Sequence, residues 1–323
     1  MVLSDLGCVP VACPEHQLSL SSTQRPERSL LLAPPGSGVL PLFDRGWIAD
    51  DGSRRPYLAY VTAEQPVNWS SDLESLHEES SRTHFLDRWT RSAILSRIGP
   101  IGQQAAIADV GCSTGYLLHD LRQAHPQATL IGVDMVSAGL EKAHGLVASA
   151  LLLRADCRQL PIVASTLDAI VSANLLEHVP DDQRALAEFA RVLRPGGRAV
   201  IVVPAGPSTY DYYDRFLGHE RRYGRRELAR KCAGAGLEVI EDGYIASLLF
   251  PAFWLVKQRN RRLHRDLYGE ALEAKVASDI SMTQRSLLGE ATWSLERRLA
   301  ALGVRLPFGI RSLVVARRPG GRS

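Results

Sequence analysis

An apolar run that leads into a glycine-rich loop and a helix start constrains the fold of this chain most strongly. The stretch reads Ile107-Ala-Asp-Val-Gly-Cys-Ser-Thr-Gly-Tyr-Leu-Leu118. Gly111 and Gly115 allow a sharp turn and let a ligand lie against bare backbone, while the helix that follows points unpaired N–H groups over the loop. The spacing D-x-G-x-S-x-G differs from the dinucleotide fingerprint, and the loop lacks the lysine of a P-loop. Because Asp109 adds a carboxylate, the loop favours a ligand with a cationic group over a pyrophosphate.

Strand and helix signals alternate through the hundred residues around this loop. Strands are expected at 105–110, 129–133, 150–153, 167–172 and 198–203, with amphipathic helical patterns between them. This alternation is typical of an α/β, doubly wound parallel sheet with helices on both faces. Ligands of such sheets bind beyond the carboxyl ends of the strands, where Asp134, Asp156 and the segment Asn174 to His178 fall.

Two of these acids have both a binding and a structural interpretation. Asp134 ends the second strand, where an acid can accept hydrogen bonds from a ribose diol, and its alternative role is that of an acid at a helix N-terminus. For Asp156, a role as a polar loop residue is equally compatible with the sequence.

Composition narrows the functional classes. The net charge of +3 is too small to indicate nucleic acid as a partner, and no basic domain with interleaved aromatic residues is attached. Five cysteines without a framework spacing favour a reducing cytoplasm, and we expect no signal peptide and no membrane span. Nothing in the spacing indicates a metal cluster or a Ser/His/Asp arrangement.

The regions outside the alternating core give weaker signals. Residues 1–65 form an irregular N-terminal segment in which Cys13 and His16 have the spacing of half a zinc site, and two ligands do not fill a tetrahedral site. We therefore predict no bound zinc there. Residues 66–323 are assigned to the main domain, with a helical insertion at about 245–306. The apolar run 248–256 and the arginines after it could dock on an anionic membrane, but a lid or a homodimer face is favoured.

The core resembles a known family. Residues 105–203 are similar to the class I S-adenosylmethionine-dependent methyltransferases whose motifs occur here as Glu177-His-Val179 and Leu193-Arg-Pro-Gly-Gly197. The resemblance implies a Rossmann-like, seven-stranded sheet with an antiparallel last strand, which residues 310–316 fit. Residues 30–42 also look like the second knuckle of the zinc ribbons that precede many methyltransferase domains, with Ala33 and Gly36 where cysteines would stand. This segment is therefore either a degenerate zinc ribbon that has lost its metal or an accidental likeness.

The same resemblance implies a cofactor site for S-adenosylmethionine. Asp134 would hold the ribose, Met135 would pack on adenine, and Asp156 with the backbone at Cys157 would bind the amino edge of adenine. The residues implied for the methionine part, together with the polar residue at the end of the fourth strand, are Asp109, Gly111, Ser113, Gly115 and Asn174. Ser113 replaces a commoner glycine, and it is still small enough for close approach.

The expected reaction is methyl transfer to an oxygen or nitrogen of a small-molecule acceptor, such as a specialised metabolite or a glycan- or lipid-linked intermediate. The alternative is a protein that uses S-adenosylmethionine structurally, for another reaction. His178 and His219 are candidates for a general base, and a structural hydrogen bond is the alternative for each. Arg222 and Tyr223 are expected to line the acceptor pocket, unless Arg221 or Arg222 pairs with Glu220 or Glu227 instead.

Overall fold

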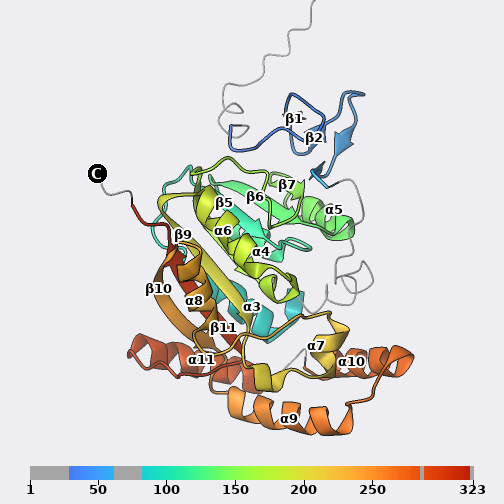
Figure 1. Ribbon diagram of the computed structural model, residues 1–323, viewed down its shortest axis with the longest axis vertical. Helices are drawn as coiled ribbons and strands as arrows, with labels where there is room; N and C mark the ends of the chain where they lie inside the picture. The colour runs from blue at the N-terminus through green and yellow to red at the C-terminus, as the bar shows by residue number, and fades with distance from the viewer. Residues whose placement is uncertain (1–28, 62–81, 284–286, 321–323) are drawn as a thin grey trace, which may run out of the picture.

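The computed structural model describes residues 29–61, 82–283 and 287–320. Its main element is an eight-stranded sheet (Figure 1). The strands are β4 (Leu58–Ala59), β5 (Ala106–Val110), β6 (Thr129–Asp134), β7 (Leu151–Arg154), β8 (Leu167–Ala173), β9 (Leu193–Pro204), β10 (Glu238–Ile245) and β11 (Arg311–Arg317). In the sheet they follow the order β10-β11-β9-β8-β5-β6-β7-β4.

The strand directions confirm the predicted doubly wound sheet. Strands β4 to β9 pair in parallel, whereas β11 is antiparallel to both of its neighbours, β9 and β10. The last strand of the chain is therefore inserted beside the fifth predicted strand. Strand β9 begins at Leu193, earlier than the expected 198, because Leu193 already pairs with Leu167 of β8.

Helices cover both faces of the sheet. The helices on one face are α3 (Phe85–Leu95), α4 (Tyr116–Ala124) and α5 (Ser137–Leu146), and those on the other are α6 (Asp182–Val192) and α8 (Glu227–Gly234). Alternation along β5 divides its side chains between the two cores. Ala108 and Val110 pack with α6 and α8, while Ile107 packs with α3, α4 and α5.

The N-terminal segment is more closely tied to the sheet than expected. Strands β1 (Leu42–Phe43), β2 (Trp47–Ile48) and β3 (Arg54–Arg55) form a small antiparallel sheet. The Trp47 side chain is buried, and its indole nitrogen donates a hydrogen bond to the carbonyl of Leu152 at 3.0 Å. Because β4 pairs with β7, the main sheet begins before the predicted domain boundary at residue 65 and has eight strands rather than seven. Cys13 and His16 lie outside the described residues.

The predicted insertion before the last strand is helical. It consists of α9 (Phe250–Leu263), α10 (Gly269–Thr283) and α11 (Leu287–Ala301), which gather at the lower end of the molecule in Figure 1. Trp293 of α11 stacks on Trp89 of α3, with ring centroids 5.9 Å apart. No helix in the described ranges is long and apolar enough to cross a membrane.

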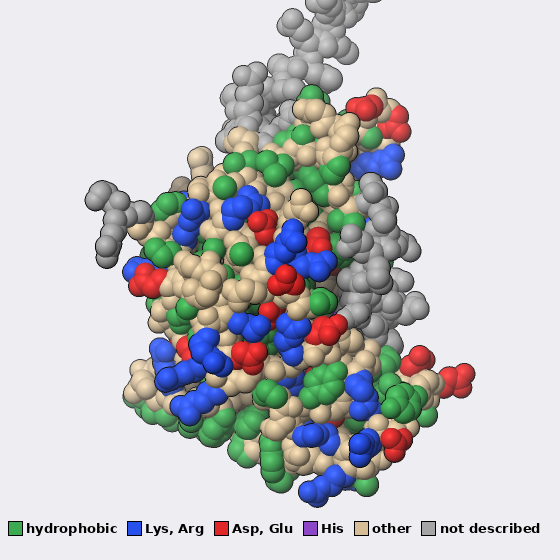
Figure 2. Space-filling model, in the orientation of Figure 1, with side chains coloured by type: hydrophobic (Ala, Val, Ile, Leu, Met, Phe, Trp, Pro, Cys, Tyr) green, Lys and Arg blue, Asp and Glu red, His purple; other side chains and the backbone are tan. Residues whose placement is uncertain are grey.

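The outer face of α9 mixes apolar and basic side chains. Figure 2 shows both kinds interspersed along the lower end of the molecule. Leu255 and Val256 are exposed beside the exposed Arg259 and Arg262. An apolar hollow of about 450 Å³ is lined by Phe250, Pro251, Trp254, Leu255 and Phe308. The lid or homodimer face and the membrane surface both stay predictions for this helix.

Candidate functional site

The glycine-rich loop after β5 takes the backbone shape that its sequence predicts. Gly111, Ser113 and Gly115 have φ values of 84°, 46° and 85°, in the left-handed region that favours glycine. A Cβ on Gly115 would lie 2.8 Å from the Cβ of Ala143, and one on Gly111 would lie 2.9 Å from the Cβ of Leu175. The missing side chains therefore make room for neighbouring protein segments. Direct contact of these glycines with a ligand stays a prediction.

Asp134 ties the end of β6 to this loop. Its Oδ2 accepts a hydrogen bond from the backbone N–H of Ser113 at 2.8 Å, and its Oδ1 accepts one from Val136 at 2.9 Å. Burial raises the pKa of Asp134, and the two N–H groups oppose this shift. Val136 is the N-cap of α5, so Asp134 lies two residues before this cap, and no acid lies in the first turn of the helix. Each carboxylate oxygen retains a lone pair that a ribose hydroxyl could use.

Asp109 presents a buried acceptor beside the loop. Its side chain is 1% exposed, and Oδ2 has no hydrogen-bond partner among the described residues. Burial, followed by the charge of Asp134, raises the pKa of Asp109 to about 8. Oδ1 of Asn174, at the end of the neighbouring β8, is also buried without a partner in the described part of the chain. Two such acceptors fit S-adenosylmethionine, which carries an amino group, hydroxyls and a positive sulfonium.

The residues predicted to surround adenine are already engaged with the protein. The Asp156 carboxylate receives hydrogen bonds from the guanidinium and the backbone N–H of Arg158, at 2.7 and 2.8 Å. Burial alone would raise the pKa of Asp156, but the hydrogen bonds from Arg158 lower it below its usual value. Cys157 is buried, which raises the pKa of its thiol to about 12, and the carbonyl of Met135 accepts a hydrogen bond from Arg154. Their contacts with adenine stay predictions.

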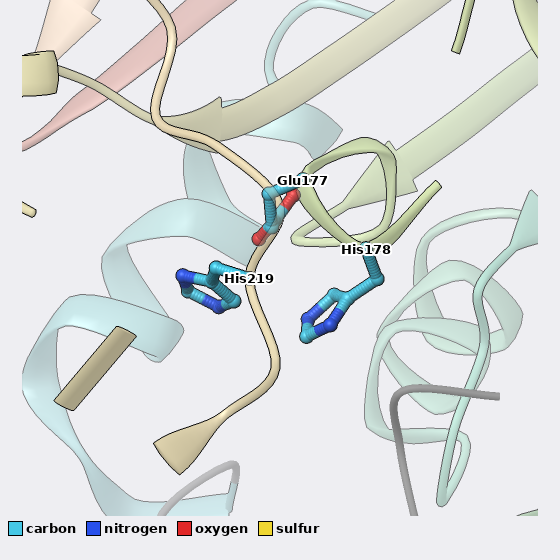
Figure 3. A group of neighbouring side chains, drawn as sticks. All are labelled: Glu177, His178 and His219. Carbon is cyan, nitrogen blue, oxygen red and sulfur yellow. The ribbon is translucent and has the colours of Figure 1, made fainter. Parts of the chain in front are cut away.

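A second polar group follows β8 directly. The turn η1 (Leu176–His178) carries Glu177 and His178, and His219 approaches from the loop after α7 (Tyr212–Phe216) (Figure 3). One polar atom of each side chain lies within 4.8 Å of those of the other two. The two imidazole rings meet edge to face, with centroids 4.7 Å apart. Glu177 is fully buried, which raises its pKa to about 7.

Asp214 orients the His219 ring of this group. Its Oδ1 lies 2.8 Å from Nδ1 of His219 and accepts a hydrogen bond from Nε of Arg222 at 2.6 Å. Although burial alone would raise it, the bond to His219 and the charge of Arg222 hold the pKa of Asp214 well below its usual value. Asp214 is therefore a carboxylate, and a proton on Nδ1 of His219 is donated to it.

The contacts of Arg222 and Tyr223 differ from the expectation. Arg222 is 8% exposed and pairs with Asp214, and Tyr223 is fully buried and donates a hydrogen bond from its hydroxyl to Asp182 at 2.7 Å. Arg221 pairs with Asp182 as well, so the arginines bind neither Glu220 nor Glu227 in the contacts described. Both predicted acceptor-lining side chains are thus held inside the protein. Their role toward an acceptor has no support from these contacts.

Asp214 and Glu177 are the site residues that the sequence did not single out. Glu177 stood in the family motif but carried no predicted role, and its position directly before His178 was the available signal. No sequence pattern could identify Asp214, because the fold around α7 brings it together with its partners His219 and Arg222.

Comparisons with known proteins show which family the chain resembles. A protein-family model described as a methyltransferase domain matches residues 108–201. The chain is 32% identical over 198 residues to the ubiquinone/menaquinone biosynthesis C-methyltransferase UbiE of Syntrophotalea carbinolica, which covers 57% of this chain and 80% of that relative. It is 37% identical over 97 residues to a malonyl-acyl-carrier-protein O-methyltransferase of Hahella chejuensis, covering 29% of this chain and 34% of that protein.

A solved structure supports the fold. A chain in the complex between the Trm112 methyltransferase activator of Haloferax volcanii and a methyltransferase superposes with a TM-score of 0.53 at 20% identity. The match covers 77% of this chain and 96% of that one. The match to the UbiE relative is 32% identical and covers 80% of that protein, which is enough to show the family. The chain belongs to the class I S-adenosylmethionine-dependent methyltransferases.

Proposed function

We propose that this enzyme transfers a methyl group from S-adenosylmethionine to an oxygen or nitrogen of a small molecule held beside Glu177, His178 and His219. The convergence of these three side chains carries the proposal. Glu177 and His178 follow β8, which is the sheet neighbour of β5, and the preceding Leu175 fills the space beside Gly111. The polar group is therefore next to the loop that the family uses for its cofactor.

The chemistry requires little from the protein beyond placement. S-adenosylmethionine, when bound, supplies a methyl group on a sulfonium, which is an electrophile with a good leaving group. The chain has to hold the acceptor in line and exclude water. With the Nδ1 proton of His219 donated to Asp214, Nε2 keeps a lone pair that can accept the proton of a hydroxyl or amine.

The names of the relatives support a small acceptor without selecting the atom. One is a C-methyltransferase of quinone biosynthesis, and the other is an O-methyltransferase of a carrier-linked acid. The proposal favours oxygen or nitrogen because a group of side chains that can accept a proton faces the acceptor. A specialised metabolite or a glycan- or lipid-linked intermediate fits this description.

Methyl-labelled S-adenosylmethionine tests the proposal. The enzyme is incubated with fractions of a cell extract, and mass spectrometry locates the label. We expect label in the small-molecule or lipid-linked fraction with the wild type. Glu177→Gln removes an ionisable group from the site and should lower the rate of methyl transfer by at least about 10-fold. His119→Gln, an exposed histidine of α4, is the matched control and should retain transfer. Label that appears only in RNA or protein would refute the proposal.

A further inference from the structure

The group formed by Glu177, His178 and His219 has the composition of a metal site. We propose that these three side chains bind one divalent transition-metal ion, and that this ion carries the oxygen of a hydroxylated acceptor. Binding of the ion is argued from the side chains alone. The part that concerns the acceptor rests on the proposed function.

Glu177 is the first reason. Its carboxylate is fully buried, and neither oxygen has a hydrogen-bond partner among the described residues. Nearby arginines do not fill this role, since Arg222 donates to Asp214 and Thr209, and Arg311 donates to Asp87 and Thr90. A buried carboxylate without a donor is costly, and coordination of a cation is one of the few ways to satisfy both oxygens.

His219 is the second reason. Its Nδ1 faces the buried carboxylate of Asp214 at 2.8 Å, so the lone pair of the ring lies on Nε2. A histidine that ligates a metal almost always donates its other N–H to a carboxylate or carbonyl, which fixes the ring and makes the ligating nitrogen more basic. Asp214 is itself held by Arg222, so the orientation of His219 is set before any ion binds.

The geometry of the group is the third reason. Glu177 and His178 lie on η1, and His219 lies on the loop after α7. The backbone N–H of Glu220 donates a hydrogen bond to the carbonyl of Glu177 at 2.8 Å and fastens the two segments together. Figure 3 shows the three side chains converging from these segments. Two atoms that are each about 2.1 Å from one ion lie at most about 4.2 Å apart. The three ligand atoms now lie within 4.8 Å of one another, so small side-chain rotations would bring them close enough to bind one ion.

The ligand set selects the class of ion and its effect. Two imidazoles and one carboxylate suit Zn²⁺, Mn²⁺, Fe²⁺ or Co²⁺, whereas Mg²⁺ and Ca²⁺ prefer oxygen ligands throughout. Three protein ligands leave positions open for a substrate oxygen. A coordinated hydroxyl loses its proton to water more readily. Its oxygen then forms the bond to the methyl carbon while the carbon–sulfur bond breaks, giving S-adenosylhomocysteine. In this ion-bound form Nε2 of His219 is a ligand, so water takes the proton in place of the His219 base of the proposed function.

Titration of the chelator-treated full chain with Co²⁺ alone, followed by visible absorption and by competition with Zn²⁺, tests the site. We expect one ion per chain in this group. Glu177→Gln and His219→Gln should each weaken binding by at least about 10-fold, the size that loss of even an outer partner causes. The matched controls are His119→Gln and Cys13→Ser, which change a histidine outside the group and a cysteine of the half-site pattern in the N-terminal segment, and both should bind as the wild type does.

Two results would overturn the inference. One is a wild type that takes up no ion, and the other is Glu177→Gln and His219→Gln that bind as tightly as the wild type. Melting temperatures identify a variant that does not fold, in which case the nearly isosteric Glu177→Gln decides. Methyl transfer that continues unchanged in metal-free enzyme would show that the ion takes no part in the reaction, and it would leave the proposed function intact. Failure to bind S-adenosylmethionine would remove the proposed function without changing the Co²⁺ titration.

Discussion

At the scale of single residues, Arg222 holds a buried carboxylate in place. Its guanidinium and the ring of His219 share one oxygen of Asp214, so the position of His219 depends on both. The arginine acts on the site through Asp214, as a positioning residue. We therefore expect its loss to lower the free energy of unfolding.

Arg222→Ala should lower the free energy of unfolding by about 3–5 kcal/mol, because it leaves Asp214 buried without its charged partner. Urea denaturation measures this. Arg317→Ala is the control, since it breaks an exposed pair with Glu238 and should cost no more than about 1 kcal/mol. A stable Arg222→Ala variant with a raised acceptor KM would instead support direct contact with the acceptor.

Gly115 gives a second prediction at this scale. Its φ of 85° and the 2.8 Å approach to Ala143 make any side chain unfavourable, so Gly115→Ala should destabilise the protein by about 1–3 kcal/mol. Gly145→Ala in α5 meets no atom within 4 Å and should be neutral or stabilising by up to about 1 kcal/mol. Thermal unfolding distinguishes the two, and equal melting temperatures would contradict the packing described here.

At the scale of elements, local sequence was sufficient for most of the sheet. Apolar runs such as 129–133 became buried strands, and the antiparallel last strand appeared where the family resemblance placed it. Strand β4 could not be predicted, because two residues carry no periodicity and its pairing with β7 arises from tertiary contact. The site divides in the same way. Asp134 and the pair Glu177 and His178 sit at predictable strand ends, whereas the approach of His219 depends on the folding of α7.

A buried ion pair is one of the contacts that attach α9 to the rest of the molecule. Lys257 is 7% exposed, and its Nζ lies 2.7 Å from Oδ1 of Asp211, the N-cap of α7. Lys257→Met should lower the free energy of unfolding by about 3–5 kcal/mol, because it leaves the buried Asp211 carboxylate without its charged partner. Denaturant unfolding of a double-mutant cycle with Asp211→Asn checks this. The double variant should lose less than the sum of the two single variants, and strict additivity would show that the pair is not coupled.

At the scale of the whole molecule, the buried Asp109 links stability to pH. Its pKa is raised to about 8 by burial and by Asp134, compared with about 3.9 in an unfolded chain. The folded state holds this proton more tightly, so the stabilising contribution is complete below the unfolded pKa and is lost as pH rises through 8.

The unfolding free energy of the cofactor-free enzyme should therefore decline between about pH 4 and pH 8 more steeply in the wild type than in Asp109→Asn. Melting temperatures of both proteins across this range measure the difference. Above about pH 9 the gap should stay constant, because Asp109 is then ionised in both states. Parallel pH profiles of the two proteins would show that Asp109 is already ionised when the protein is folded.

The cofactor assignment connects all three scales, because it places the ends of β5, β6 and β8 around one ligand. Calorimetric binding of S-adenosylmethionine to the wild type and to Asp134→Ala is its most direct test. The wild type should bind, and loss of the carboxylate should weaken binding by about 1.5–3 kcal/mol, the range for hydrogen bonds to a charged group. Glu238→Ala, which removes an exposed acid, should bind as the wild type does. Unchanged affinity in Asp134→Ala, or wild-type binding of NADH with comparable strength, would contradict the assignment.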